Sequence, residues 1–227
     1  MRKSLFTLSV LAMALAAPLA QAHEAGSLIV RAGAATVDPH EDSGSLGVDR
    51  GAAAGTNLGG KATVDSDTQL GLTFTYMLTD HIGAELVAAT PFQHEVGVKG
   101  LGALDGKLAD IKQLPPTLLL QYYPLDASSK FQPYVGAGVN FTWFFDEDLT
   151  SSRKDQGFSN LNLENSWGLA GEAGFDYMLT DNMLFNASVW YMDIDTKATT
   201  DLAGVGRVKV DVDVDPWVYM IGLGYKF

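Results

Sequence analysis

The sequence contains no cysteine, few histidines and little positive charge. Without cysteine, neither a disulfide framework nor a thiolate metal site can form. The 227 residues carry 15 Lys and Arg against 27 Asp and Glu, for a formal net charge of −12, and such an acidic chain is a poor partner for nucleic acid. The four histidines are scattered without zinc-ligand spacing, at His23, His40, His81 and His94. We therefore expect no metal, no cofactor, no nucleic-acid partner and no enzymatic activity.

Long apolar runs are also missing after the first 22 residues. No later segment holds 18 or more uninterrupted apolar residues, which excludes a helical membrane span. Residues 1–22 have the charged start, the short apolar core and the A-x-A site of a cleaved signal peptide, and that core is too short for a membrane anchor. The mature chain would be one domain, residues 23–227. Because lipid leaves no backbone group unpaired, a closed β-barrel is the remaining way for it to cross a membrane.

The last eleven residues, Trp217 to Phe227, alternate strictly in character. Every second side chain is large and apolar or aromatic, and those between are smaller and mixed. A period of two is typical of a strand with two different faces, and about eleven residues suit a tilted strand that crosses a bilayer. Aromatic residues at both ends are typical of interfacial belts. We interpret this segment as the closing strand of a barrel and expect the barrel-assembly machinery to bind it through Phe227.

Seven further segments alternate in the same way, which gives the even count of an outer-membrane barrel. The strands are expected at 27–37, 68–78, 82–89, 115–123, 133–145, 165–179, 184–193 and 217–227. Connections at 79–81, 124–130 and 180–182 are short, and those at 40–66, 94–112, 146–162 and 196–206 are interpreted as long loops. Short periplasmic turns and long outer loops place both termini in the periplasm. The fold class is an all-β, eight-stranded antiparallel transmembrane β-barrel; the alternative is a soluble, lipocalin-like barrel.

The charged residues of the strands lie on the face that has the smaller, mixed side chains. A lipid-facing Arg at mid-depth would cost roughly 2–4 kcal/mol, so this face is expected to line the lumen. It carries Asp176 and the candidate channel-lining residues Ile29, Arg31, Glu85, Leu119, Gln121, Tyr123, Tyr134, Phe144, Glu172 and Trp190. Eight strands leave room for little more than side chains, which argues against a wide pore. Arg31, Glu85 and Glu172 form either a structural ion-pair cluster or a gate, and the apolar residues suggest a narrow hydrophobic pocket in the extracellular half.

Three prolines lie near the same end of neighbouring strands. Proline lacks the N–H that a ladder needs and is confined to edges and bulges. Pro91, Pro115 and Pro116 therefore either end the ladder at this level or mark a lateral gap through which an apolar solute could leave into the bilayer.

Aspartates alternate with valines before the last strand. Asp211, Asp213 and Asp215 could bind Ca²⁺, which prefers oxygen ligands, but no EF-hand pattern follows them, and a solvated extension above the membrane is favoured. The apolar face changes sides near Pro216, which suggests a β-bulge.

Several stretches resemble the outer membrane protein W (OmpW) family. They are L-I-V-R-A-G with V-D-P from residue 28, H-I-G-A-E-L running into A-A-T-P-F from residue 81, P-P-T with Q-Y-Y from residue 115, and K-F-Q-P-Y-V-G-A-G-V-N-F-T from residue 130. The resemblance implies an eight-stranded barrel in the outer membrane of a Gram-negative bacterium, surrounded by lipid and lipopolysaccharide, with the alkane-uptake barrels as relatives. It also implies a narrow channel for small hydrophobic solutes.

Two functions therefore compete. The apolar lumen and the prolines favour passive uptake of small hydrophobic molecules, whereas the narrow interior and the long acidic loops favour a non-transporting surface barrel for adhesion, stress tolerance or envelope integrity. An enzyme that modifies acyl chains would need a nucleophile, and no motif places one.

Overall fold

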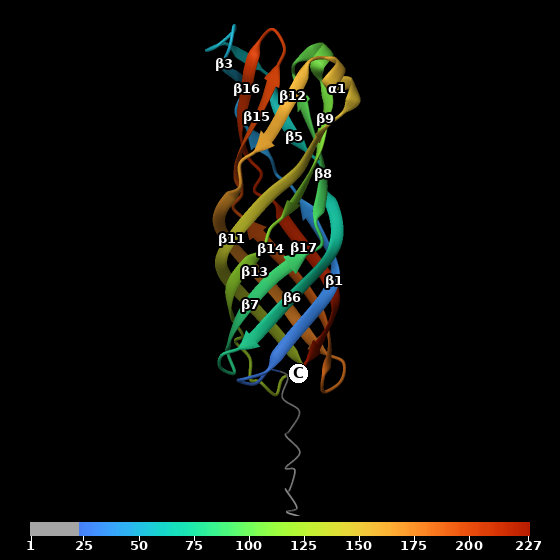
Figure 1. The fold of residues 1–227 in the computed structure, drawn as a ribbon. Helices are drawn as coiled ribbons and strands as arrows, with labels where there is room; N and C mark the ends of the chain where they lie inside the picture. Colours follow the sequence, from blue (N-terminus) through green and yellow to red (C-terminus); the bar gives the residue numbers. More distant parts are fainter. Residues whose placement is uncertain (1–22) are drawn as a thin grey trace, which may run out of the picture.

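A computed structural model describes residues 23–227 (Figure 1). The predicted signal peptide, residues 1–22, lies outside the described residues. No helix within residues 23–227 has the length and apolar character needed to span a membrane. Eight strands close an antiparallel barrel, as predicted. In chain order they are β1 (Leu28–Asp38), β6 (Asp67–Met77), β7 (Ile82–Ala89), β10 (Thr117–Tyr122), β11 (Phe131–Leu149), β13 (Ser166–Met178), β14 (Met183–Met192) and β17 (Trp217–Lys226).

Each barrel strand pairs with its neighbours in chain order. The pairing of β1 with β17 closes the ring, from Ile29 opposite Lys226 to Asp38 opposite Trp217. Three short connections, at 78–81, 123–130 and 179–182, lie at one end, which we call the turn end. The C-terminus also lies at this end (Figure 1).

Large apolar side chains cover the outer face of the barrel. Leu118, Leu169 and Ile221 are 59%, 69% and 63% exposed, and a continuous surface of this kind is not stable in water. Aromatic side chains are exposed near both rims, including Tyr76, Tyr122, Tyr177 and Tyr225 at the turn end and Trp143, Trp167, Tyr191 and Trp217 at the other. These are the lipid-facing band and interfacial girdles of an outer-membrane barrel, and they contradict the lipocalin-like alternative.

The four segments interpreted as long loops are mostly strands, so that interpretation was wrong. They build an extension that continues the barrel beyond the membrane (Figure 1). Its elements are β2 (Asp42–Ser43), β3 (Leu46–Arg50), β4 (Asn57–Gly59), β5 (Lys61–Val64), β8 (Phe92–Lys99), β9 (Gly106–Leu114), β12 (Phe158–Leu163), β15 (Asp195–Leu202) and β16 (Gly206–Asp213), with the single-turn helices η1 (Gly102–Leu104) and α1 (Ser151–Asp155). One wing runs β11–β9–β8–β5, and the other β12–β15–β16–β3–β4.

The polarity of the strand faces inverts between the barrel and the extension. Along β16 and β17, Val212, Val214, Val218 and Met220 all point inward and are buried. The side-chain alternation therefore continues through Pro216, and the β-bulge predicted there was wrong. What changes is the outside: water around the extension favours outward aspartates and inward valines, whereas lipid around the barrel favours outward aromatic and aliphatic residues.

Candidate functional site

The ten predicted channel-lining residues all point into the barrel or its extension and are buried, between 0% and 7% exposed. They occupy three levels along the axis. Ile29, Tyr123 and Tyr134 form a floor at the turn end, Arg31, Glu85, Gln121 and Glu172 form a polar layer above it, and Leu119, Phe144 and Trp190 belong to an apolar upper lumen.

Arg31 is the centre of the polar layer. Its guanidinium donates two hydrogen bonds to the carboxylate of Asp176, with Nε at 2.9 Å from Oδ1. The same group donates to Thr75 at 2.7 Å and to Glu85 at 3.2 Å. It also donates to the Tyr123 hydroxyl at 3.1 Å. A buried cation surrounded by so many acceptors is an ordering element, because guanidinium geometry fixes each partner.

Glu172 does not join the Arg31 ion pairs, in contrast to the predicted three-residue cluster. Gln121 donates to Glu172 Oε2 at 2.9 Å and accepts from the Tyr123 hydroxyl at 2.8 Å. Glu85 Oε2 and Glu172 Oε1 are buried without a hydrogen-bond partner. The cluster is therefore a ring of linked side chains that holds more acid than base.

The floor closes the turn end of the lumen with apolar and aromatic side chains. Ile29, Tyr123 and Tyr134 pack there with Met77, Met178 and Leu184. The prediction of an extracellular pocket was therefore wrong for Ile29, Tyr123 and Tyr134. His23 also belongs to the floor, with its ring 4.8 Å from that of Tyr123. No sequence pattern indicated this, because His23 precedes the first alternating segment.

The upper lumen is mostly apolar, with one buried polar group, Thr117, Asn140 and Thr142, whose side chains are hydrogen-bonded to one another beside Met192. Leu119, Phe144 and Trp190 pack with inward residues of several strands and of the extension, among them Phe92, Met192, Ile194, Val218 and Met220. Two small cavities interrupt this packing. One of about 20 Å³ lies beside Trp190 and Met220, and one of about 60 Å³ lies between the two wings of the extension, lined by Leu46, Val98, Leu163 and Val210 among others.

The three prolines lie where barrel strands end. The β6–β7 ladder stops at Gly71 opposite Ala89, and the β7–β10 ladder stops at Val87 opposite Thr117. Pro91 separates β7 from β8, and Pro115 and Pro116 separate β9 from β10. Beyond this level β8 pairs with β9 and β5 but not with β6. We call this unpaired boundary between β6 and β8 the seam; the cavity of about 20 Å³ reaches Ala88 and Pro115 beside it.

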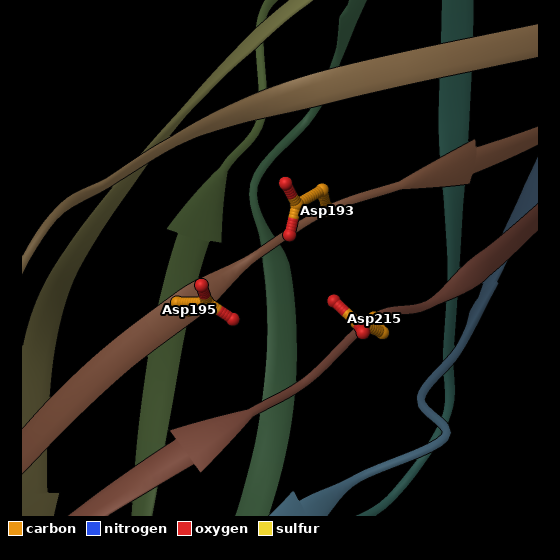
Figure 2. Close-up of side chains that lie close together, drawn as sticks. All are labelled: Asp193, Asp195 and Asp215. Carbon is orange, nitrogen blue, oxygen red and sulfur yellow. The ribbon is translucent and has the colours of Figure 1, made fainter.

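The acidic residues at the base of the extension are grouped differently from the prediction. Asp193, Asp195 and Asp215 offer carboxylate oxygens within 4.8 Å of one another (Figure 2), whereas Asp211 pairs with Lys197 at 3.7 Å. Burial is the main cause that raises the pKa of the Asp195 carboxyl, and the nearby Asp193 carboxylate raises it further. Asp215 accepts hydrogen bonds from the Tyr191 hydroxyl and the Ile194 amide. The predicted set Asp211, Asp213 and Asp215 therefore does not form one Ca²⁺ site.

We expect His94 to make the stability of the extension depend on pH. Burial lowers its pKa below 6.5, although a hydrogen bond to the Asp65 carbonyl opposes this. The neutral ring contacts that carbonyl at 2.7 Å and the Gln113 amide at 2.9 Å. The folded-state pKa of His94 lies below its unfolded value of 6.5. The stability that neutral His94 contributes is therefore fully present above pH 6.5 and is lost as the pH falls through the folded-state pKa.

We expect amide hydrogen exchange in β8 and β9, corrected for intrinsic rates, to become faster between about pH 7 and pH 5. His94→Asn should remove most of this difference because asparagine does not titrate. An equal pH dependence in the variant would assign the effect to other groups.

Comparisons with known proteins agree with this architecture. A sequence model of the OmpW family matches residues 24–227. The chain is 51% identical over 207 residues to outer membrane protein W of Escherichia coli (strain K12), with 91% of each chain covered. It is 28% identical over 191 residues to outer membrane protein AlkL of Ectopseudomonas oleovorans, covering 82% of this chain and 76% of that one. The crystal structure of outer membrane protein OprG from Pseudomonas aeruginosa matches with a TM-score of 0.86 at 66% identity, covering 91% and 98% of the two chains. All three relatives carry the names of outer membrane proteins rather than of enzymes.

Proposed function

This chain belongs to the outer membrane protein W (OmpW) family, and on that premise we propose that it provides a narrow passive route for small hydrophobic molecules across the outer membrane. The observation that carries the proposal is the apolar upper lumen, which continues from the wings of the extension down to Leu119 and Trp190. Apolar surface gains about 25 cal/mol for each Å² removed from water. A small hydrocarbon is therefore stabilised along this path, whereas a hydrated ion is not.

The route leaves the barrel sideways. The floor and the Arg31 layer fill the lower lumen, so a solute that has reached Trp190 has no apolar path along the axis. At this level the cavity of about 20 Å³ extends toward Pro115 and the seam. Opening of the seam breaks no strand ladder, because β6 and β8 are not paired, but it releases the hydrogen bond from the Gln93 amide to Asp67 at 2.8 Å. Pro91, Pro115 and Pro116 mark its position.

The asymmetry of the ends supports an orientation that is part of this proposal. The turn end and both termini face the periplasm, and the extension faces the outside, where lipopolysaccharide surrounds it. The outward side of β17, ending at Phe227, is the surface for the barrel-assembly machinery.

Uptake of a radiolabelled short alkane tests the proposal. Cells that express the protein should take up the tracer several-fold faster than cells with an empty vector, with folded protein confirmed by heat-modifiable gel mobility. Equal uptake for several apolar tracers would contradict the proposal. It would favour the second candidate, a non-transporting surface barrel, which the close packing of the lumen supports.

A further inference from the structure

His23 is held in the floor by one ring nitrogen, while the other has no partner. Nε2 lies 2.8 Å from Oδ2 of Asp176, and the side chain is fully buried. Nδ1 is buried without a hydrogen-bond partner. Nearly all buried polar atoms in proteins are hydrogen-bonded, so an unpartnered ring nitrogen requires an explanation.

The surroundings determine which nitrogen carries the proton. Asp176 accepts two hydrogen bonds from Arg31 and also faces Nε2, so Nε2 donates to the carboxylate and Nδ1 keeps its lone pair. A histidine that donates one N–H to a carboxylate and presents the other nitrogen unprotonated is the arrangement that orients histidine ligands in metal sites.

The second ligand would be created by processing. In the unprocessed chain the main-chain nitrogen of His23 is a peptide N–H, which donates to the Ala127 carbonyl at 3.4 Å. Cleavage after Ala22, the predicted site, converts it into a free amine. An α-amine and the Nδ1 of the same histidine can close a six-membered chelate ring around one metal ion.

We propose that, after cleavage between Ala22 and His23, the α-amine and Nδ1 of His23 bind a divalent transition-metal ion of the copper class at the barrel floor. Two nitrogen donors suit Cu²⁺, which also stands highest among the divalent ions in general affinity. Charges of both signs lie near the ring: the Asp176 carboxylate contacts Nε2, and Arg31 and Lys226 are the nearby cations.

Copper titration of the processed, full-length barrel tests the proposal. The protein is purified folded from membranes, and intact mass must show a chain that begins at His23. Binding of one Cu²⁺ is measured by calorimetry, and nitrogen ligation by electron paramagnetic resonance. The matched variants are His23→Ala, which loses Nδ1, and His40→Ala, which loses an exposed histidine of the outer region. Two references are the peptide of residues 23–27, which has both nitrogens but no fold, and refolded unprocessed chain 1–227, which lacks the amine.

We expect the processed barrel and His40→Ala to bind Cu²⁺ at least about tenfold more tightly than the peptide, because Asp176 fixes the ring. We expect His23→Ala and the unprocessed chain to bind Cu²⁺ at least about tenfold more weakly than the processed barrel. A mature chain that begins elsewhere would overturn the proposal, as would His23→Ala binding like the wild type. Affinity equal to that of the peptide would also overturn it, since the fold would then contribute nothing.

Discussion

Replacement of Arg31 by alanine is expected to lower the free energy of unfolding of the barrel by about 3–5 kcal/mol, the range for removal of one partner from a buried ion pair. The reason is the set of groups left behind. Asp176 and Glu85 would lose their cation while remaining fully buried, and the Tyr123 and Thr75 hydroxyls would lose a partner. Denaturant unfolding in lipid vesicles, followed by tryptophan fluorescence, measures the change.

Two further variants make the Arg31 result specific. Arg31→Lys should recover only part of the loss, because an ammonium is a point charge and cannot reproduce the planar donor geometry. Arg50→Ala should leave stability unchanged, since Arg50 is exposed and pairs only at the surface with Asp49. If Arg31→Ala were as stable as the wild type, the polar layer would not be an ordering element of the fold.

Replacement of Ala89 by aspartate is expected to reduce alkane uptake at least about tenfold, to the level of an empty vector. Ala89 lines the cavity of about 20 Å³ beside the seam. A carboxylate there would bring water into the passage, and each CH₂ of the solute would lose about 0.8 kcal/mol of apolar stabilisation. The measurement is initial uptake of the labelled alkane by cells with equal amounts of folded protein.

Ala89→Val is the matched control for this experiment. Valine is close to aspartate in size but apolar, so uptake should stay near that of the wild type. If aspartate and valine reduced uptake equally, bulk rather than polarity would be responsible. If neither changed uptake while the unmodified protein still transported, the solute would leave by a path other than the seam.

The barrel strands were predictable because lipid imposes an unusual pattern. A strand such as β17 exposes Trp217, Tyr219 and Ile221 to the membrane and turns small residues inward, and this alternation is visible without any structure. The extension strands were missed because they bury different residues. In β8 the inward positions include Phe92 and His94, and the strand also contains Gly97, so no apolar stripe of the barrel kind is present.

The sequence predicted which strand face carries the lumen residues, but not their level along the barrel axis or their hydrogen-bond partners. Alternation fixes which side chains point inward, and all ten do so. The level of Tyr134 depends on how strands β10 to β13 are tilted and staggered, which the sequence does not state. The hydrogen-bond partners also depend on how the strands are arranged. Gln121 donates to Glu172 because β10 and β13, which carry them, lie on either side of β11. His23 lies outside every strand, so only its contact with Asp176 reveals it.

The inversion of polarity near Pro216 locates the outer surface of the membrane along the chain. Asp213 is exposed to water and Trp217 to the interface, so the boundary between the two solvents falls within residues 214–216. At a rise of about 3.3 Å per residue, this interval spans roughly 10 Å. Spin labels placed outward at successive odd-numbered positions from 209 to 221 should therefore change abruptly from accessibility to a water-soluble quencher to accessibility to oxygen, and the step gives the immersion depth of the whole barrel.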